Sequence, residues 1–238
     1  MSLSALDNIV WHSLAGPQER FSAGGKTARR FARGFGPLCG FADPQRPGLG
    51  ELEPHCDVGE HVFCGRWDSA APDGWRIDME VPAEQMVWGG GTPEDEEVAA
   101  NGGDSGGENP GAIVRLGARD VPQMLELVAL TQPGPFGQRT IELGEYFGIY
   151  EEGALVAMAG ERMEAASLRE ISAVCTHPDL QGRGLARRLM HLLIRRQRRR
   201  GLVPFLHVMQ YNTRAIAMYE RMGFRRHRQW VLRVVCRT

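Results

Sequence analysis

The chain has 238 residues and a formal net charge of −1 at pH 7, and at this length two compact units are more common than one. No stretch approaches the roughly 18 consecutive apolar residues of a membrane span, and the first eight residues lack the basic start and apolar run of a signal peptide. We therefore expect a cytoplasmic protein with no membrane partner. The five cysteines are sparse and odd in number, which argues against a disulfide framework.

A glycine-rich acidic stretch predicts where the chain divides. Eight glycines and a run of carboxylates lie between Gly89 and Gly111, which predicts a linker over 92–111. Residues 112–238 then form one unit. Residues 1–91 are interpreted as a smaller α/β domain, with a helix at 18–33 and strands at 61–67 and 75–88.

The two halves differ in charge. Residues 1–111 carry 8 basic and 18 acidic side chains, a net of −10, whereas residues 112–238 carry 20 and 11, a net of +9. The halves therefore have different electrostatic roles or attract each other. The run Arg195–Arg200 raises the alternative of a nucleic-acid-binding protein, but no stacking aromatics are interleaved with it. We interpret it as a solvated helix face that attracts a polyanionic ligand, and we expect no nucleic-acid partner.

Two histidines and two cysteines lie close together in the first half, at His55, Cys56, His61 and Cys64. Their spacing matches no standard zinc motif, and residues 62–67 have the pattern of a strand. We expect no metal site here.

Residues 112–238 have clear boundaries between elements. Apolar periodicity and turn residues predict the order strand, helix, three strands, helix, strand, helix and strand. Asp120 is expected to cap the first helix, and Asn212 the last. The predicted elements lie at 112–116, 121–131, 146–150, 154–161, 168–176, 184–200, 203–209, 212–222 and 231–235.

The most informative segment is Cys175–Met190, where a strand runs into a turn containing Gly182 and Gly184 and then into a helix. Glycine lets the backbone approach a ligand without a Cβ in the way, and the first helical turn offers unpaired N–H donors and a partial positive charge. A pyrophosphate fits such a turn. Two glycines alone are also typical of an ordinary strand-to-helix turn.

Two motifs resemble those of a known family. The run Gln181-Gly-Arg-Gly-Leu-Ala186 resembles the Gln/Arg-x-x-Gly-x-Gly/Ala signature of the GCN5-related N-acetyltransferases (GNAT), and Asn212–Phe224 resembles their Asn-x-x-Ala-x-x-x-Tyr-x-x-x-Gly-Phe segment. The resemblance covers about residues 112–238, particularly the branch with an FR47-like C-terminal half. It implies a mixed α+β GNAT fold, with a mixed, largely antiparallel central sheet flanked by helices. Residues 1–91 resemble the degenerate first copy of this fold in two-domain relatives such as glycine-acyltransferase-like proteins.

The family pattern implies an acyl-coenzyme A site along one strand and the turn after it. Val174, Cys175 and Thr176 are expected to pair with the pantetheine arm. The Val174 N–H is also expected to stabilise the oxyanion formed from the thioester. The main-chain amides of the turn are expected to bind the pyrophosphate, and two residues downstream to contact the coenzyme arm: Gln181, Gly182, Arg183, Gly184, Leu185, Ala186 and Arg187, then Asn212 and Tyr219.

The phenol of Tyr219 is the candidate for protonating the leaving thiolate, a role that needs the donor within about 3 Å of sulfur. Against this, an aromatic at helical spacing is more often part of the core. Cys175 suggests a covalent acyl-enzyme, but it lies in a strand and has no obvious histidine partner in the sequence. It is interpreted as a small buried residue.

Glu170 is the candidate base for the attacking amine, which must lose a proton to donate its lone pair. A solvated charge at a sheet edge is an equally good interpretation of its position. Strict alternation along the strand would place Glu170 with Ser172 and Val174 on one face, and Ile171, Ala173 and Cys175 on the other.

The resemblance implies an N-acetyltransferase that uses acetyl-coenzyme A, or another acyl-coenzyme A, and no metal, with direct attack of a small-molecule or peptide amine on the thioester. The alternatives are a glycine-acyltransferase-like enzyme that uses a longer acyl-coenzyme A, and a non-catalytic acyl-coenzyme A sensor. No motif identifies the acceptor, and the oligomeric state is left open, a homodimer included. The acidic residues 1–91 are expected to cover one side of the acceptor site.

Overall fold

A computed structural model describes residues 3–65, 67–91 and 111–238. In the last of these ranges the elements follow the predicted order, and most bounds agree with the prediction to within a few residues. No helix of the described residues is long and apolar enough to cross a membrane. The elements are β6 (Ile113–Arg115), α2 (Val121–Thr131), β7 (Tyr146–Glu151), β8 (Ala154–Ala165), β9 (Leu168–Thr176), α3 (Leu185–Arg199), β10 (Val203–Met209), α4 (Thr213–Arg221) and β11 (Phe224–Arg237).

The two predicted helix caps have different outcomes. Asn212 caps α4, because its side-chain oxygen accepts a hydrogen bond from the Ala215 N–H at 3.2 Å. Asp120 makes no side-chain cap for α2. Its carboxylate instead accepts two hydrogen bonds. One comes from the Gly117 N–H at 2.7 Å, in the 3₁₀ turn before the helix, and the other from the Tyr150 hydroxyl at 2.8 Å.

The predicted helix at 18–33 is wrong. The stretch forms a short 3₁₀ turn and a β-hairpin, because Gly24 adopts φ 131° and reverses the chain, so that Ser22 pairs with Phe31. A Cβ at Gly24 would lie 2.4 Å from the Ala28 carbonyl oxygen, so this reversal requires glycine. The elements of the first half are η1 (Ser4–Asn8), α1 (Ile9–Leu14), η2 (Glu19–Phe21), β1 (Ser22–Gly24), β2 (Ala28–Phe31), β3 (Cys39–Phe41), η3 (Leu49–His55), β4 (His61–Gly65) and β5 (Trp75–Trp88).

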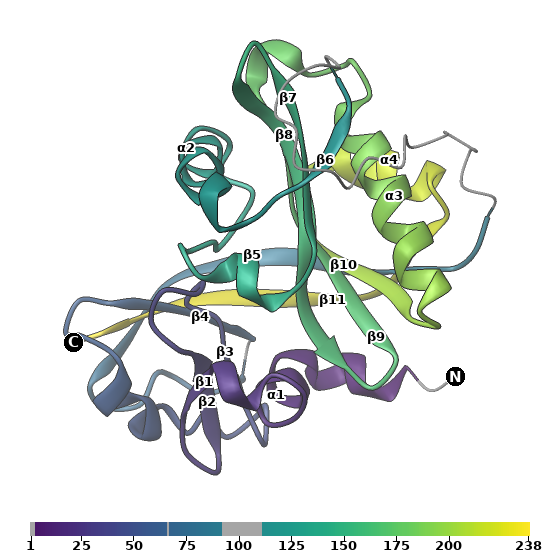
Figure 1. Ribbon diagram of the computed structural model, residues 1–238. Helices are drawn as coiled ribbons and strands as arrows, with labels where there is room; N and C mark the ends of the chain where they lie inside the picture. The colour runs from purple at the N-terminus through teal and green to yellow at the C-terminus, as the bar shows by residue number, and fades with distance from the viewer. Residues whose placement is uncertain (1–2, 66, 92–110) are drawn as a thin grey trace.

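An eight-stranded sheet with the order β4-β11-β5-β10-β9-β8-β7-β6 links both halves of the described chain (Figure 1). All its pairings are antiparallel except that of β9 with β10, so the sheet is mixed and largely antiparallel, as predicted. The small sheet β1-β2-β3 belongs to the first half alone.

The large sheet crosses the predicted domain boundary. Strand β5 pairs with β11 along its whole length and with β10 over residues 83–87, while β4 pairs with the other edge of β11. The division into 1–91 and 112–238 therefore does not separate two sheets, because β4 and β5 are built into the sheet of the second half. The predicted linker, 92–111, lies outside the described residues apart from Gly111.

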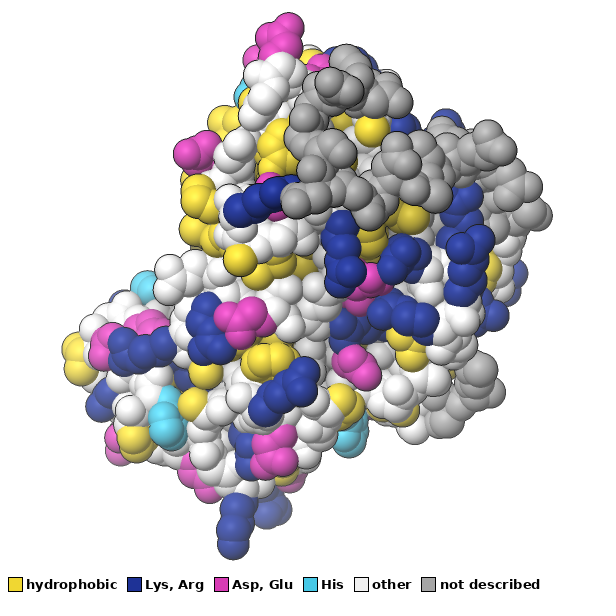
Figure 2. Space-filling view, in the orientation of Figure 1, with side chains coloured by type: hydrophobic (Ala, Val, Ile, Leu, Met, Phe, Trp, Pro, Cys, Tyr) yellow, Lys and Arg dark blue, Asp and Glu magenta, His cyan; other side chains and the backbone are white. Residues whose placement is uncertain are grey.

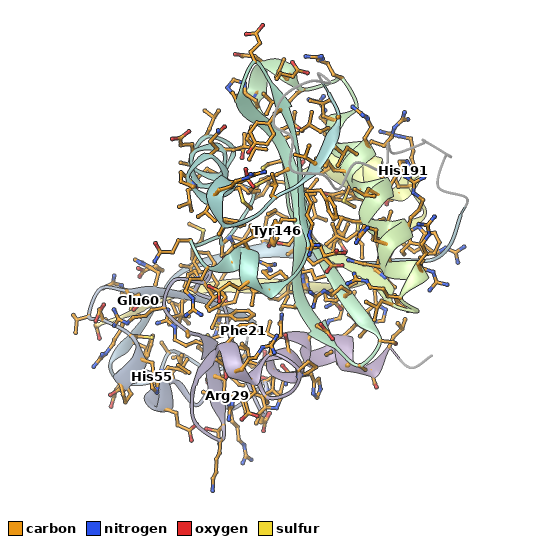
Figure 3. All side chains as sticks on the ribbon, in the orientation of Figure 1. Phe21, Arg29, His55, Glu60, Tyr146 and His191 are labelled. Carbon is orange, nitrogen blue, oxygen red and sulfur yellow. The ribbon has the colours of Figure 1, made fainter. Side chains whose placement is uncertain are left out.

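Side chains pack on both faces of this sheet (Figures 1 and 3). Helices α3 and α4 cover one face through residues such as Leu189, Leu193 and Ile216. On the opposite face, α2 packs in a cluster that contains Tyr146. The segment η1–α1 packs beside it, with Phe205 of β10 in its cluster. The first half of the chain thus covers the face of β10 that α3 and α4 leave uncovered.

Candidate active site

The sheet opens between β9 and β10, its one parallel pair. The two strands are in register only over Leu168–Glu170 and Val203–Phe205. Beyond Phe205, β10 pairs with β5 and no longer with β9. The carboxyl-terminal part of β9 therefore has a backbone edge without a strand partner among the described residues, and an extended ligand with amide groups can hydrogen-bond to such an edge.

A β-bulge lies in β9 at this opening. The register with β8 shifts between the pairs Ser172–Gly160 and Cys175–Met158, so the two residues Ala173 and Val174 lie opposite the single residue Ala159, and Ala173 adopts φ 53°. A non-glycine residue with positive φ is uncommon, and such strain clusters at functional sites. Val174 thus has no register partner in β8 or in β10 within the described chain.

The bulge breaks the alternation predicted for this strand. Ile171 belongs to the core cluster under α3 and α4, and Val174 packs against the same cluster. Ala173 and Cys175 belong to the cluster with α2 on the opposite face. The prediction that Ile171, Ala173 and Cys175 share a face is therefore wrong, because the extra residue reverses the order of the side chains.

The turn before α3 has the open backbone that the sequence indicates. Gly182 and Gly184 adopt φ 85° and 79°, and a Cβ at Gly184 would have no atom within 4 Å. The N-cap residue of α3, Gly184, has no side chain to accept a hydrogen bond, and the N–H groups of the first turn have no intrahelical acceptor. The residues that form the turn fit a pyrophosphate, whose charge the helix dipole favours.

Basic side chains surround the turn. Figure 2 shows Lys and Arg side chains gathered over the face that α3 occupies. The Arg183 guanidinium lies 2.9 Å from a carboxylate oxygen of Glu151, and Arg214 of α4 donates to the Gln181 side chain at 3.3 Å. Part of the predicted basic run is used within the molecule, because Arg196 pairs with both carboxylate oxygens of Glu145, at 2.8 and 2.6 Å.

Tyr219 lies on the buried face of α4, in the cluster that Val174 contacts. Its ring packs edge-on against Phe224, with the centroids 6.0 Å apart. Burial raises the pKa of the Tyr219 phenol above its usual range, so the hydroxyl keeps its proton at neutral pH. The side chain is thus part of the core and is also a protonated donor on the same side of the sheet as Val174.

Cys175 has the properties of a buried core residue. Its exposed fraction is 7%, and burial raises the pKa of its thiol to about 11. Because the thiolate is the nucleophile, this environment disfavours an acyl-enzyme on Cys175. The hydroxyl of the next residue, Thr176, is buried and has no hydrogen-bond partner among the described residues.

Glu170 is the centre of a buried charged network. It is 1% exposed, and its carboxylate accepts two hydrogen bonds from Arg162, at 2.8 and 2.7 Å. The Nδ1 atom of His207 lies 2.8 Å from the same carboxylate. Burial alone would raise the pKa of Glu170, but the charge and hydrogen bonds of Arg162 and the hydrogen bond of His207 outweigh it and lower the pKa to about 2. The interpretation as a solvated edge charge is therefore wrong.

The partners of Glu170 were not among the predicted site residues. His207 is the one titratable side chain of the strand Val203–Met209, and a histidine within an otherwise apolar strand was a signal. Arg162 follows the predicted end of its strand, so its burial could not be seen from local pattern. Neither residue has a marker that connects it to Glu170.

The residues of the rejected zinc set are not brought together. Cys56 accepts from Arg30 at 2.9 Å, while His61 contacts Asp78 at 2.8 Å. Among the described residues, the group of His, Cys, Asp or Glu side chains with ligand atoms within 4.8 Å of one another is His61, Asp78 and Cys236. Asp78 is already paired with Arg76 at 2.5 Å.

Comparisons with known proteins agree with this geometry. The FR47-like protein family matches residues 146–232. A structure from Novosphingobium aromaticivorans, assigned as an acetyltransferase of the GNAT family, is 35% identical, covers 98% of each chain and has a TM-score of 0.82. A GCN5-related N-acetyltransferase-like protein from Streptococcus suis has the same fold, with 15% identity over 96% of this chain and 92% of that chain and a TM-score of 0.58. No curated protein sequence matches. On its fold, its open parallel strands and its full-length similarity, the chain belongs to the GCN5-related N-acetyltransferase family.

Proposed function

We propose that the chain is an N-acetyltransferase that transfers an acetyl group from acetyl-coenzyme A to the amine of a small molecule or peptide. One observation carries the proposal. Strands β9 and β10 separate directly before the glycine-rich start of α3, and the bulged residue Val174 lies at that separation without a register partner among the described residues. The arrangement offers an edge for an amide-containing arm and an anion site at its end.

The residues of the turn would hold the coenzyme through main-chain groups. The amides of Gly182, Arg183, Gly184, Leu185 and Ala186 would bind the pyrophosphate, with Gln181 and Arg187 flanking them. The backbone at Gly184 is open to a ligand, because an added Cβ there would have no atom within 4 Å. Val174, Cys175 and Thr176 would pair with the pantetheine arm through their backbone, since the Cys175 side chain points into the core. Asn212 and Tyr219 would contact the arm from α4.

In the transfer step the amine nitrogen attacks the thioester carbonyl carbon, a C–N bond forms and the C–S bond breaks. The Val174 N–H would stabilise the oxyanion, because it is not committed to a neighbouring strand in the register. Tyr219, which keeps its proton, would donate it to the leaving sulfur. The proton of the attacking ammonium must pass to a base on the protein, and the buried carboxylate of Glu170 would support that base.

The test is calorimetric titration of acetyl-coenzyme A into Gly184→Glu and a matched control, Gly201→Glu. Both glycines have positive φ, 79° and 73°, and neither would have an atom within 4 Å of an added Cβ. Gly184 precedes α3 and Gly201 follows it, so both variants have similar backbone strain, and only the first places a carboxylate at the pyrophosphate. We expect at least a tenfold loss of affinity in Gly184→Glu alone. Equal affinity in both folded variants would disprove the coenzyme site.

A further inference from the structure

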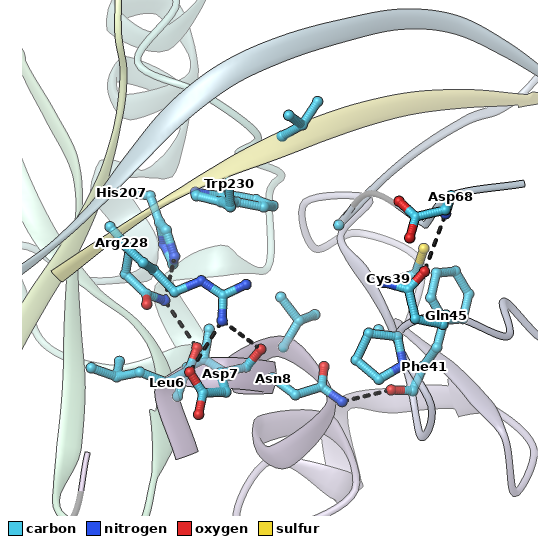
Figure 4. A pocket seen from close by; sticks show the side chains of 17 residues that line it. Leu6, Asp7, Asn8, Cys39, Phe41, Gln45, Asp68, His207, Arg228 and Trp230 are labelled. Atoms are coloured by element: carbon cyan, nitrogen blue, oxygen red, sulfur yellow. Dashed lines mark hydrogen bonds and ion pairs between the residues drawn. The ribbon is translucent and has the colours of Figure 1, made fainter. Parts of the chain in front are cut away.

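A cavity lies against β10 on the face of the sheet opposite α3 and α4 (Figure 4). Its volume is about 300 Å³, and its walls come from η1, α1 and β3 on one side and from β5, β10 and β11 on the other. This size is at the lower end of the range of small-molecule sites. Two segments distant in sequence thus border a space that is separate from the glycine turn before α3.

His207 lines the cavity, and its two ring nitrogens have different partners. Nδ1 contacts Glu170 at 2.8 Å, and Nε2 lies 3.1 Å from the side-chain nitrogen of Gln85. That Gln85 nitrogen also donates to the Leu6 carbonyl at 3.2 Å, which fixes which end of the amide is the donor. His207 therefore accepts at Nε2 and carries its proton at Nδ1, where it donates to Glu170.

Two buried polar atoms of the cavity wall lack partners among the described residues. They are Gln85 Oε1, an acceptor on a side chain that is 3% exposed, and Trp230 Nε1, a donor. Most buried polar groups in folded proteins are hydrogen-bonded, so these two atoms indicate a ligand with both a donor and an acceptor. The Trp230 ring lies 5.1 Å from the His207 ring, so both atoms belong to the same end of the cavity as His207.

His207 links the cavity to the opening between β9 and β10, because it lines the cavity and contacts Glu170 of β9. The strands are in register up to Glu170 and Phe205. His207 is two residues beyond Phe205, and Val174 is four beyond Glu170 with the bulge taking up one position. At about 3.3 Å per residue, His207 and Val174 differ by only about 3 Å along the strand direction. A thioester held in the opening would thus be approached from the His207 side of the sheet.

We propose that this cavity binds the acceptor, a small primary amine with an apolar or aromatic body, and that His207 is its catalytic base; the proposal rests on the function proposed above. The amine nitrogen would replace the Gln85 amide at Nε2 and give its proton to that atom. The same nitrogen forms the bond to the acetyl carbon, and the sulfur leaves. Glu170 is the positioning residue that holds the tautomer, with a carboxylate that Arg162 in turn fixes.

The lining of the cavity supports this class of acceptor. Phe41 and Trp230 supply aromatic surface, and Leu6, Ile9 and Val231 supply aliphatic surface. The lining includes two carboxylates, Asp7 and Asp68, and one guanidinium, Arg228, which lies 3.1 Å from the Asp7 carboxylate. The excess of negative charge favours a cationic amine over an acid. An arylalkylamine fits both features, since its ring would pack on Trp230.

The experiment uses 2-phenylethylamine as the probe, spermidine as the polar comparison, and the full chain with acetyl-coenzyme A. Released thiol reports turnover, and calorimetry reports binding of each amine to the protein saturated with coenzyme A. His207→Asn removes the base. Gly65→Leu fills the cavity, because Gly65 lines it and an added Cβ would meet only the Trp230 ring, at 4.0 Å. Gly50→Leu is the matched control, at an exposed position of the 3₁₀ helix η3 that does not line the cavity.

We expect the wild type to bind and acetylate 2-phenylethylamine in preference to spermidine. His207→Asn should lower kcat on the order of 10²-fold or more while coenzyme binding is kept. Gly65→Leu should raise KM for the amine at least tenfold, and Gly50→Leu should change neither constant. The wild-type preference needs no variant, so it holds as a test if a variant fails to fold.

Three outcomes would overturn all or part of the inference. Turnover of spermidine but not of 2-phenylethylamine, with no effect of Gly65→Leu, would place the acceptor elsewhere and leave the proposed function intact. Failure of the wild type to bind coenzyme A would overturn both this inference and the proposed function. Full kcat in a folded His207→Asn variant would show that another group removes the proton.

Discussion

Replacing Glu170 with glutamine tests how much its ion pair with Arg162 stabilises the folded protein. The substitution keeps the size of the side chain but removes its charge from a pair in which Arg162 is 10% exposed and Glu170 is 1% exposed. It leaves a buried guanidinium without its counter-charge, and one of the two oxygen acceptors becomes an amide donor. Breaking a buried pair in this way typically costs about 3 to 5 kcal/mol of folding free energy.

The lowered pKa of Glu170 also indicates that its ionised form stabilises the folded state, and it predicts how this stability depends on pH. A lowering of this pKa from its ordinary 4.5 to about 2 corresponds to about 3 kcal/mol that favours the ionised form in the folded state. For an acid with a depressed pKa, this stability is fully present above the unfolded value of 4.5. It is then lost as the pH falls from about 4.5 towards about 2.

Urea denaturation of wild type, Glu170→Gln and Glu142→Gln at pH 7 is the assay. Glu142 makes the matched pair at the surface: it binds Arg139 through two hydrogen bonds of 2.8 Å, but both side chains are more than 40% exposed. We expect a loss near 3 kcal/mol for Glu170→Gln and below about 1 kcal/mol for Glu142→Gln. Repeated at pH 3, the difference between wild type and Glu170→Gln should narrow. Equal losses for both variants, or a difference independent of pH, would refute the reasoning.

Two further substitutions separate structural from functional roles in α4. Tyr219→Phe keeps the ring packing against Phe224, so coenzyme affinity should hold while turnover falls on the order of 10²-fold; unchanged turnover would make Tyr219 structural only. Asn212→Ala removes the cap of α4 and should cost about 1 kcal/mol in thermal or urea unfolding. Asn212→Asp keeps an acceptor oxygen and should keep this stability, so a weaker coenzyme affinity in the aspartate variant would reveal a contact beyond the cap.

The second half of the fold could be predicted because its signals are local. Glycines end α3 and α4, apolar periodicity marks α3, and Pro178 follows the end of β9. The glycine turn before α3 was predicted for the same reason, since strand, glycines and helix are contiguous. The bulge at Ala173 was not predicted, because strict alternation is the default for a strand and no glycine marks the positive φ.

The role of the first half could not be predicted, because its pairings are long-range. The strand bounds Trp75–Trp88 were predicted correctly, but nothing in that strand indicates that its partners lie in β10 and β11, more than a hundred residues later. Gly89–Gly111 resembles a linker on composition, and composition says nothing about which strands pair across it. Burial of Arg162 and Glu170 likewise depends on packing between η1–α1 and the sheet.

The insertion of β5 between β10 and β11 has a consequence for synthesis of the protein. The middle of the sheet cannot close until residues 203–237 have left the ribosome, because both neighbours of β5 lie in that stretch. Until then β5 has two unpaired edges with buried-type residues such as Met86 and Val87, and exposed edges of this kind are prone to pair with other chains. The sheet should therefore form slowly, and nascent chains should depend on chaperones until β10 and β11 have been made.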